Sequence, residues 1–103
     1  MSNIIYEIGG CELSIHDIAG LNLVLQQMSD NKYDLTEGAP SWMKHALDML
    51  VLEGILRRIG MPDNWTNSWI LTAGGQEFVE DPEILADINM VTEVADMASG
   101  FYN

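Results

Sequence analysis

Residues 43–80 have the sequence MKHALDMLVLEGILRRIGMPDNWTNSWILTAGGQEFVE and contain the most regular hydrophobic pattern of the chain. Apolar residues recur in the first part of this stretch at the 3.6-residue period of a helix. They are Met43, Ala46, Leu47, Leu50 and Val51, with Gly54 at the end. The pattern predicts an amphipathic helix at the centre of the core, introduced by Pro40 and Ser41.

An antiparallel pair of strands is predicted after this helix. Residues 55–59 alternate bulky and charged side chains, and residues 65–71 return as a second extended run. Residues 60–64, with the sequence GMPDN, have the composition of a turn. Residues 57–71 therefore predict a hairpin.

Two further helices are predicted downstream of the hairpin. Thr72 stands where an N-cap is expected, ahead of a short helix that contains residues 76–79. Residues 81–83, Asp-Pro-Glu, supply the cap and first turn of a last helix. We expect this helix to run to about Ser99, before Gly100 ends it.

The N-terminal part of the chain predicts a strand, a helix and a connection. Residues 3–13 favour a short strand and turn, or a small hairpin, around Gly9-Gly10. Ser14, with Asp17 three residues later, predicts the start of a helix of about four turns. Gly20 within that helix lowers its stability by roughly 1 kcal/mol relative to alanine. Residues 32–39 are interpreted as polar connecting chain or a short helical turn.

Two of these runs resemble the winged helix-turn-helix domain. Residues 46–58 have the sequence ALDMLVLEGILRR, and residues 69–75 have the sequence WILTAGG. In that family a helix ends in a Leu-x-x-x-Gly run, a β-hairpin wing follows, and the second wing strand finishes with Leu-Thr-x-x-Gly. The resemblance covers about residues 14–80. It implies a mainly α fold with a small antiparallel β-sheet, in which three to five helices accompany a β-hairpin wing.

The length and composition predict a single cytoplasmic domain. A chain of 103 residues is long enough for one hydrophobic core. We expect residues 1–103 to form one domain, with the winged-helix-like core at residues 14–80 and a C-terminal acidic helix at residues 81–99. The single cysteine, Cys11, excludes an internal disulfide and suits a reducing compartment. Without a secretory signal or a run of about 18 apolar residues, we expect no membrane association, and the host-cell cytoplasm if the protein is phage-encoded.

The charge of the chain is strongly unbalanced. Sixteen acidic and four basic residues give a net charge of −12. Such a chain repels phosphate backbones and attracts basic surfaces. The cations are Lys32, Lys44, Arg57 and Arg58, and every charged residue after Arg58 is acidic. The excess is interpreted either as an ordinary solvated surface or as a face for a cationic partner.

Seven carboxylates near the C-terminus are the predicted partner-binding residues. They are Glu77, Glu80, Asp81, Glu83, Asp87, Glu93 and Asp96. Spaced anionic side chains on a rigid helix can imitate the phosphate rows that a nucleic-acid-binding protein recognises, although any soluble acidic helix has the same pattern. Trp65 and Trp69, near the wing, are predicted either as anchors for a protein partner or as core residues.

The last helix carries two apolar stripes. Ile84, Ile88, Val91 and Ala95 form the stripe that is expected to pack on the core. Met90, Val94, Met97 and Phe101 form a second stripe, about 120° round the helix. The second stripe is predicted either to cover another part of the same core or to form a homodimer contact.

Direct DNA binding is disfavoured by the sequence. In the winged-helix resemblance, residues 41–52 correspond to the helix that enters the major groove, but a groove-reading helix normally carries several cationic or amide side chains. The wing tip, residues 61–67, contains no cation. DNA binding would depend on a homodimer that brings the few cationic side chains together. The DNA-binding residues under this alternative are Lys44, His45, Arg57 and Arg58.

No pattern favours catalysis, a cofactor or a metal site. His16 with Asp17, and His45 with Asp48, are the nearby histidine and carboxylate pairs. They are interpreted as surface or capping residues, because nucleophilic catalysis needs a nucleophile and an orienting group in one cleft. Four carboxylates between residues 80 and 87 lack the ligand order of an EF-hand.

The sequence therefore predicts a noncatalytic acidic protein-binding module. It would engage the basic surface of a nucleic-acid-handling complex and block it. Size and charge are similar to those of small phage-encoded inhibitors, including anti-CRISPR and anti-restriction proteins. The alternatives are a winged-helix transcriptional regulator that dimerises and binds DNA, and a structural adaptor within a larger assembly.

Overall fold

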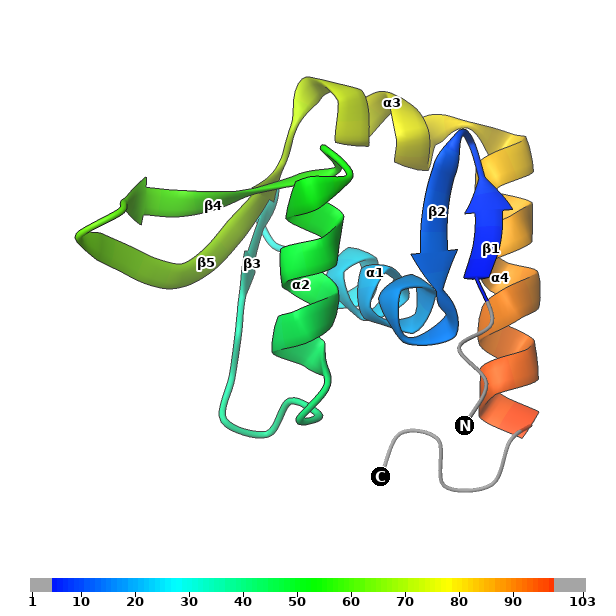
Figure 1. Cartoon of the computed structure of the whole chain (residues 1–103), viewed down its shortest axis with the longest axis horizontal. Coiled ribbons are helices and arrows are strands. Elements are labelled where there is room, and N and C mark those ends of the chain that lie inside the picture. The colour runs from blue at the N-terminus through cyan, green and yellow to red at the C-terminus, as the bar shows by residue number, and fades with distance from the viewer. Residues whose placement is uncertain (1–4, 98–103) are drawn as a thin grey trace.

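The computed structural model describes residues 5–97, with side chains as far as Glu93. Its elements in chain order are β1 (Ile5–Ile8), β2 (Cys11–Ser14), α1 (Ile15–Gln27), β3 (Lys32–Asp34), α2 (Met43–Leu52), β4 (Leu56–Met61), β5 (Asn64–Leu71), α3 (Ala73–Glu80) and α4 (Pro82–Met97). Figure 1 shows the β4–β5 hairpin projecting at one end of the longest axis and α4 lying at the other end. Helix α1 lies between α2 and α4 and contacts both.

The prediction of a mainly α fold with one small antiparallel sheet is wrong. Residues 5–97 form a mixed α and β fold with four helices and two antiparallel sheets. One sheet has the strand order β3-β5-β4, and β1 and β2 form the other. Strands β1 and β2 pair only with each other, so residues 5–14 do not extend the wing. The hairpin expected at residues 57–71 is confirmed as β4 and β5.

Strand β3 is the element that the sequence did not predict. Residues 32–34 were expected in connecting chain or a helical turn, but they pair with β5, where Tyr33 lies opposite Trp69. A tight turn precedes the strand, since Asp30 and Asn31 both have positive φ and Ser29 and Lys32 exchange two backbone hydrogen bonds of 2.9 Å. Asp and Asn tolerate this left-handed backbone better than most residues, which makes them favoured turn formers. Three residues are too few for an alternating pattern to be visible in the sequence.

Helix α1 begins as its sequence predicts. The Ser14 hydroxyl accepts a hydrogen bond of 3.1 Å from the Asp17 backbone, and the Ser14 backbone donates one of 3.0 Å to the Asp17 carboxylate. This capping box satisfies two otherwise unpaired donors at the helix start. Gly20 does not break the helix. A Cβ placed on it would lie 2.7 Å from the Ala46 Cβ, so the glycine allows α1 and α2 to approach closely.

Helix α2 packs one face into the core and ends at Gly54. Met43, Ala46, Leu47 and Leu50 are fully buried, as the period predicts. Val51 is 36% exposed, so at the C-terminal end of the helix the buried face is narrower than the sequence predicts. The helix ends in a Schellman motif, in which the Ile55 backbone donates to the Leu50 carbonyl at 2.9 Å and Gly54 donates to Val51 at 3.0 Å. Gly54 has a φ of 79°, a conformation that favours glycine.

The core combines residues from most of the elements. Its fully buried large side chains are Trp69, Tyr33, Leu13, Ile18, Leu21, Met43, Leu47, Leu50, Ile55, Leu56, Ile88 and Val24. Ile88 and Val91 of α4 belong to this cluster, and Ile84 packs against it. The first predicted stripe of the last helix is thus confirmed for its described members. Ala95 lies outside the described side chains.

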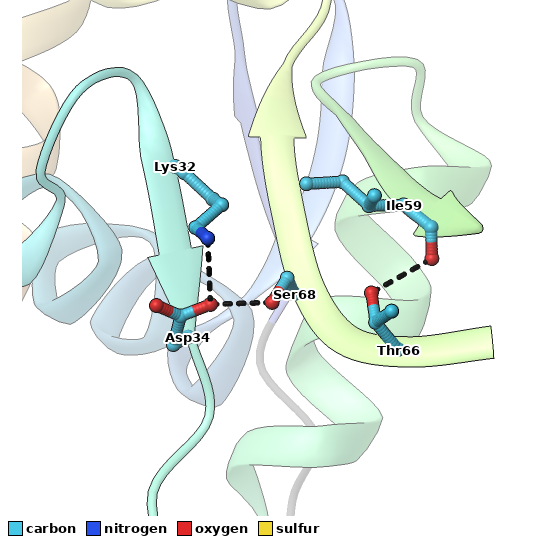
Figure 2. Close-up of polar contacts among 5 residues, drawn as sticks. All are labelled: Lys32, Asp34, Ile59, Thr66 and Ser68. Carbon is cyan, nitrogen blue, oxygen red and sulfur yellow. Dashed lines mark hydrogen bonds and ion pairs between the residues drawn. The ribbon is translucent and has the colours of Figure 1, made fainter.

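Side-chain hydrogen bonds supplement the strand pairing of the three-stranded sheet β3-β5-β4. At the β3 edge, the Asp34 carboxylate accepts from the Ser68 hydroxyl and lies 3.7 Å from the Lys32 ammonium (Figure 2). On the other side, the Thr66 hydroxyl donates to the Ile59 carbonyl at 2.9 Å (Figure 2). These groups are exposed, so each contact contributes less than about 1 kcal/mol to stability. They bridge β5 to each of its neighbours.

The base of the hairpin is joined tightly to α3. The Thr72 hydroxyl accepts a hydrogen bond of 2.9 Å from the Gly75 backbone and donates to the Gly54 carbonyl. The Thr72 backbone donates to the Ile55 carbonyl at 3.0 Å. A Cβ on Gly75 would lie 1.9 Å from that same carbonyl oxygen. Thr72 is therefore the cap that the sequence predicts, and Gly75 is required by the close approach of two backbone segments.

Substitution of Gly75 by alanine tests this close approach. The added methyl group would force α3 away from Ile55, and we expect Gly75→Ala to lower the free energy of unfolding by about 1–3 kcal/mol or more. Gly74→Ala is the matched control, since its Cβ would meet no atom closer than 3.9 Å. The control should be neutral or stabilising by up to about 1 kcal/mol. Urea denaturation of both variants measures the difference, and equal effects would contradict the assignment.

Candidate functional site

The first candidate surface consists of the carboxylates on α3 and α4. Glu77, Glu80, Asp81, Glu83, Asp87 and Glu93 are all exposed. Asp96 also lies on α4, but its side chain is outside the described residues. The structure thus places the described members of the predicted set on two consecutive helices and, for Asp81, at the junction between them. We call these six residues, with Asp96, the acidic surface.

The acidic surface has almost no compensating contact. Within residues 5–93, the one ion pair joins Lys32 to Asp34. Glu80 accepts a long hydrogen bond of 3.4 Å from Gln76, and Asp81 accepts one of 2.9 Å from the Glu83 backbone, which caps α4. Asp81 therefore has a structural role in addition to its charge. The side chains of Glu77, Glu83, Asp87 and Glu93 are exposed and accept no hydrogen bond within the described part of the chain.

Met90 lies among these carboxylates on the outer side of α4. Its side chain is 59% exposed, whereas Ile88 and Val91 beside it in the sequence are buried. Met90 therefore does not cover a part of the core. The homodimer contact predicted for it stays a prediction, because the side chains of Val94 and Met97, and the whole of Phe101, lie outside the described structure.

The second candidate surface is a groove between α2 and the β4–β5 hairpin. Its volume is about 440 Å³, and its lining residues are Asp48, Val51, Leu52, Arg57, Arg58, Trp65 and Trp69. Leu52 is 77% exposed and Trp65 is 43% exposed. The sequence did not predict this site, because its residues come from three elements. We call it the wing groove.

An irregularity in the hairpin places an arginine against both tryptophans of the wing groove. Arg58 pairs with Trp69 and Gly60 pairs with Trp65, so β5 carries two more residues than β4 across this interval. The Arg58 Nε donates to the Thr66 carbonyl at 3.0 Å. Its guanidinium carbon lies 5.6 Å from the Trp65 ring centre and 5.3 Å from the Trp69 ring centre. These cation–π contacts hold the guanidinium in one position.

The two tryptophans have different roles. Trp69 is fully buried and belongs to the core, while Trp65 is partly exposed at the mouth of the wing groove. The sequence left two alternatives for these tryptophans, a core residue or an anchor for a protein partner. Trp69 is a core residue, and Trp65 is exposed enough to contact a partner.

The residues of the DNA-binding alternative are divided between two places. Lys44 and His45 are exposed at the start of α2, about 12 Å along the helix from Leu52. Arg57 and Arg58 line the wing groove, and Arg58 packs on two indole rings. The described chain therefore does not gather these groups into a continuous basic surface.

The histidine and carboxylate pairs also have ordinary surroundings. Asp17 is engaged in the capping box, and His16 makes an edge contact with Trp42, with ring centres 5.1 Å apart. His45 and Asp48 are exposed on α2. Among the residues that the structure describes, no three His, Cys, Asp or Glu side chains are arranged to hold a metal ion.

Cys11 is a half-buried thiol with a raised pKa. Burial is the largest cause of the higher pKa, and the charge of Glu53 and hydrogen bonding to Glu53 add to it. The thiolate is the nucleophilic form of cysteine, so a higher pKa makes the thiol less reactive at neutral pH. This environment is the opposite of the one that activates a catalytic cysteine.

Removal of the Glu53 charge should make Cys11 more reactive. We expect Glu53→Gln to lower the Cys11 pKa and to increase the rate of alkylation by iodoacetamide at pH 8 by roughly twofold or more, since a unit of pKa corresponds to a tenfold change in thiolate. Burial should keep the pKa above its ordinary value. Glu12→Gln is the control, because Glu12 is exposed and does not contribute to the shift. An unchanged rate in Glu53→Gln would refute the electrostatic cause.

Within residues 5–97, the structure contains no helix with the length and apolar character needed to cross a membrane. Comparisons with models of protein families, with curated proteins and with solved structures give no match to this chain.

Proposed function

We propose that the protein is a noncatalytic binding module whose acidic surface engages the basic surface of a nucleic-acid-handling complex and blocks it. The observation that carries this proposal is the set of exposed carboxylates on α3 and α4, which make no ion pair within the described chain. Charge alone would suit any solvated protein. The arrangement of the charges on rigid helices is what favours a specific partner.

A carboxylate can occupy a site built for phosphate. The arginine guanidinium binds either anion through the same planar fork of N–H donors. Glu83 and Asp87 are four residues apart on α4, which separates them by about 6 Å along the helix axis. A row of anions at such spacing offers negative charges that the basic surface of a nucleic-acid-binding partner is adapted to bind.

The acidic surface is also held rigidly. Ile88 and Val91 fix α4 to the core, and the Asp81 carboxylate caps its first turn. Side chains on a fixed helix lose less conformational entropy on binding than side chains on a loop. A rigid acidic helix can therefore compete with a nucleic acid without a preceding folding step.

An inhibitor of this type resembles, in size and charge, the small phage-encoded proteins that block CRISPR or restriction complexes. The competing function is a winged-helix regulator that binds DNA directly. The separation of Lys44 from the arginines, and the packing of Arg58 against tryptophan, count against direct binding. A net charge of −12 opposes it further.

Replacement of three α4 carboxylates by neutral amides tests the proposal. The purified protein used as bait should retain a basic nucleic-acid-binding protein, identified by mass spectrometry and then purified for a direct affinity measurement. We expect the triple variant Glu83→Gln, Asp87→Asn, Glu93→Gln to bind it roughly tenfold or more weakly, and raised salt to weaken the wild-type complex.

A matched control removes three charges elsewhere. Glu7→Gln, Glu12→Gln and Asp63→Asn change the net charge by the same amount at exposed positions outside the acidic surface. Equal loss of affinity in both triple variants would show that only net charge matters. If the bait retains no such protein and micromolar protein shifts duplex DNA at low salt, the inhibitor function is wrong and the regulator function is favoured.

A further inference from the structure

The wing groove concentrates exposed apolar surface at one place. The large hydrophobic side chains that the described chain exposes are Ile5, Val51, Leu52, Met61, Trp65 and Met90. Three of these line the wing groove: Val51, Leu52 and Trp65. Single exposed apolar residues are common on soluble proteins, but adjacent ones around a concave site indicate a binding surface. The volume of about 440 Å³ lies within the range of pockets that bind small ligands, so the groove has room for a few side chains of a partner.

The same groove has the charge opposite to that of the rest of the molecule. Arg57 and Arg58 are two of only four Lys and Arg residues in the chain, and both line it, with Asp48 as its one acidic residue. Within the described part of the chain, neither Arg57 nor the terminal Nη groups of Arg58 form a hydrogen bond or ion pair. The exposed Arg57 guanidinium is therefore suited to a carboxylate, which it can bind through two parallel N–H donors.

We infer that the wing groove is a docking site for an apolar peptide segment of another protein that carries a carboxylate. Its apolar side chains would pack on Leu52, Val51 and Trp65. Its carboxylate would pair with the exposed guanidinium of Arg57. This site is separate from the part of the acidic surface on α4, because the hairpin and α4 lie at opposite ends of the longest axis (Figure 1).

A nucleic acid fits this groove less well than a peptide. Aromatic side chains stack on bases, but single-stranded binding also needs a basic track along the phosphate backbone. Here two arginines are followed by the acidic tip residue Asp63 and bordered by Asp48. One carboxylate needs one guanidinium, which the groove provides.

A second copy of the chain is the other competing occupant. Met90 with its neighbouring carboxylates has suitable chemistry, but α4, which carries it, lies at the opposite end of the longest axis from the hairpin (Figure 1). A copy would have to make a head-to-tail contact, which closes into a ring only if the rotation between successive copies allows it and otherwise extends into a filament. A separate partner avoids this constraint.

A peptide library displayed on phage tests the inference. Selection on the wild-type protein should enrich sequences in which an aromatic or branched apolar residue stands near Asp or Glu. Enriched peptides are then synthesised with a fluorophore and their affinities measured by anisotropy. We expect Leu52→Glu and Arg57→Gln each to weaken binding at least about tenfold, as substitution of interface anchors does.

Matched controls separate the groove from general surface effects. Met61→Glu makes the same apolar-to-acidic change at a site that is 68% exposed on the hairpin but does not line the groove. Lys44→Gln removes a cation from α2 outside the groove. Both should bind the peptide within about twofold of the wild type. All four positions are exposed, so thermal melting should show that every variant folds.

Three results would overturn the inference. The first is that no enriched peptide binds, or that the enriched peptides are basic. The second is that Leu52→Glu and Met61→Glu have equal effects. The third is that the groove has one of the two competing occupants. Sedimentation would then show a wild-type oligomer that Leu52→Glu alone dissociates, or a fluorescent single-stranded oligonucleotide would bind the wild type and lose affinity in Leu52→Glu and Arg57→Gln. Leu52 lines the groove beside the hairpin, and the hairpin and α4 lie at opposite ends of the longest axis (Figure 1). Leu52→Glu should therefore leave the binding of a basic partner to α4 unchanged, so the two proposals fail separately.

Discussion

The backbone carbonyl of Ile55 is the point on which both surfaces of the protein depend. It follows the glycine that ends α2, it accepts the hydrogen bond of the Thr72 backbone, and it lies against Gly75 at the start of α3. This one peptide group therefore joins the end of α2, both ends of the hairpin and the start of α3. The direction of the hairpin relative to α2 shapes the wing groove, and the direction of α3 leads the chain to α4. A residue larger than glycine at position 75 would disturb both.

The parts of the fold that the sequence predicts are those with local signals. Ser14 and Asp17 identify the start of α1, and Thr72 identifies the start of α3, because capping depends on residues only three positions apart. The β4–β5 hairpin and the core face of α2 follow from period and turn composition. Strand β3 was missed because its strand character comes from pairing with β5, more than thirty residues later. The resulting fold has two sheets, and its resemblance to winged helices stays a prediction.

The candidate sites divide in the same way. The carboxylates of the acidic surface could be found in the sequence because they are neighbours along the chain, and the described ones are exposed, while their role as a binding site stays a prediction. The wing groove could not, because Leu52, Arg58 and Trp65 become neighbours only after the hairpin folds beside α2. The three consecutive apolar residues Leu50, Val51 and Leu52 gave a partial signal, because a helix turns through about 200° across three positions and one face cannot bury them all. The sequence also placed Arg58 in a DNA-binding set, whereas the cation–π contacts with two indole rings give it a different setting.

The separation of charge along the molecule has a kinetic consequence. Arg57 and Arg58 lie on β4 of the hairpin, whereas the residues of α4 at the other end of the longest axis include acidic side chains and no cation, so negative charge is concentrated toward α4 (Figure 1). In the field of a basic partner such a molecule rotates before contact, with α4 leading. Steering of this kind acts on the association rate and fades as salt screens the field, whereas apolar packing acts on the lifetime of a complex. Under the two proposals, α4 would therefore act in the rapid capture of a partner, and the wing groove would act in its retention.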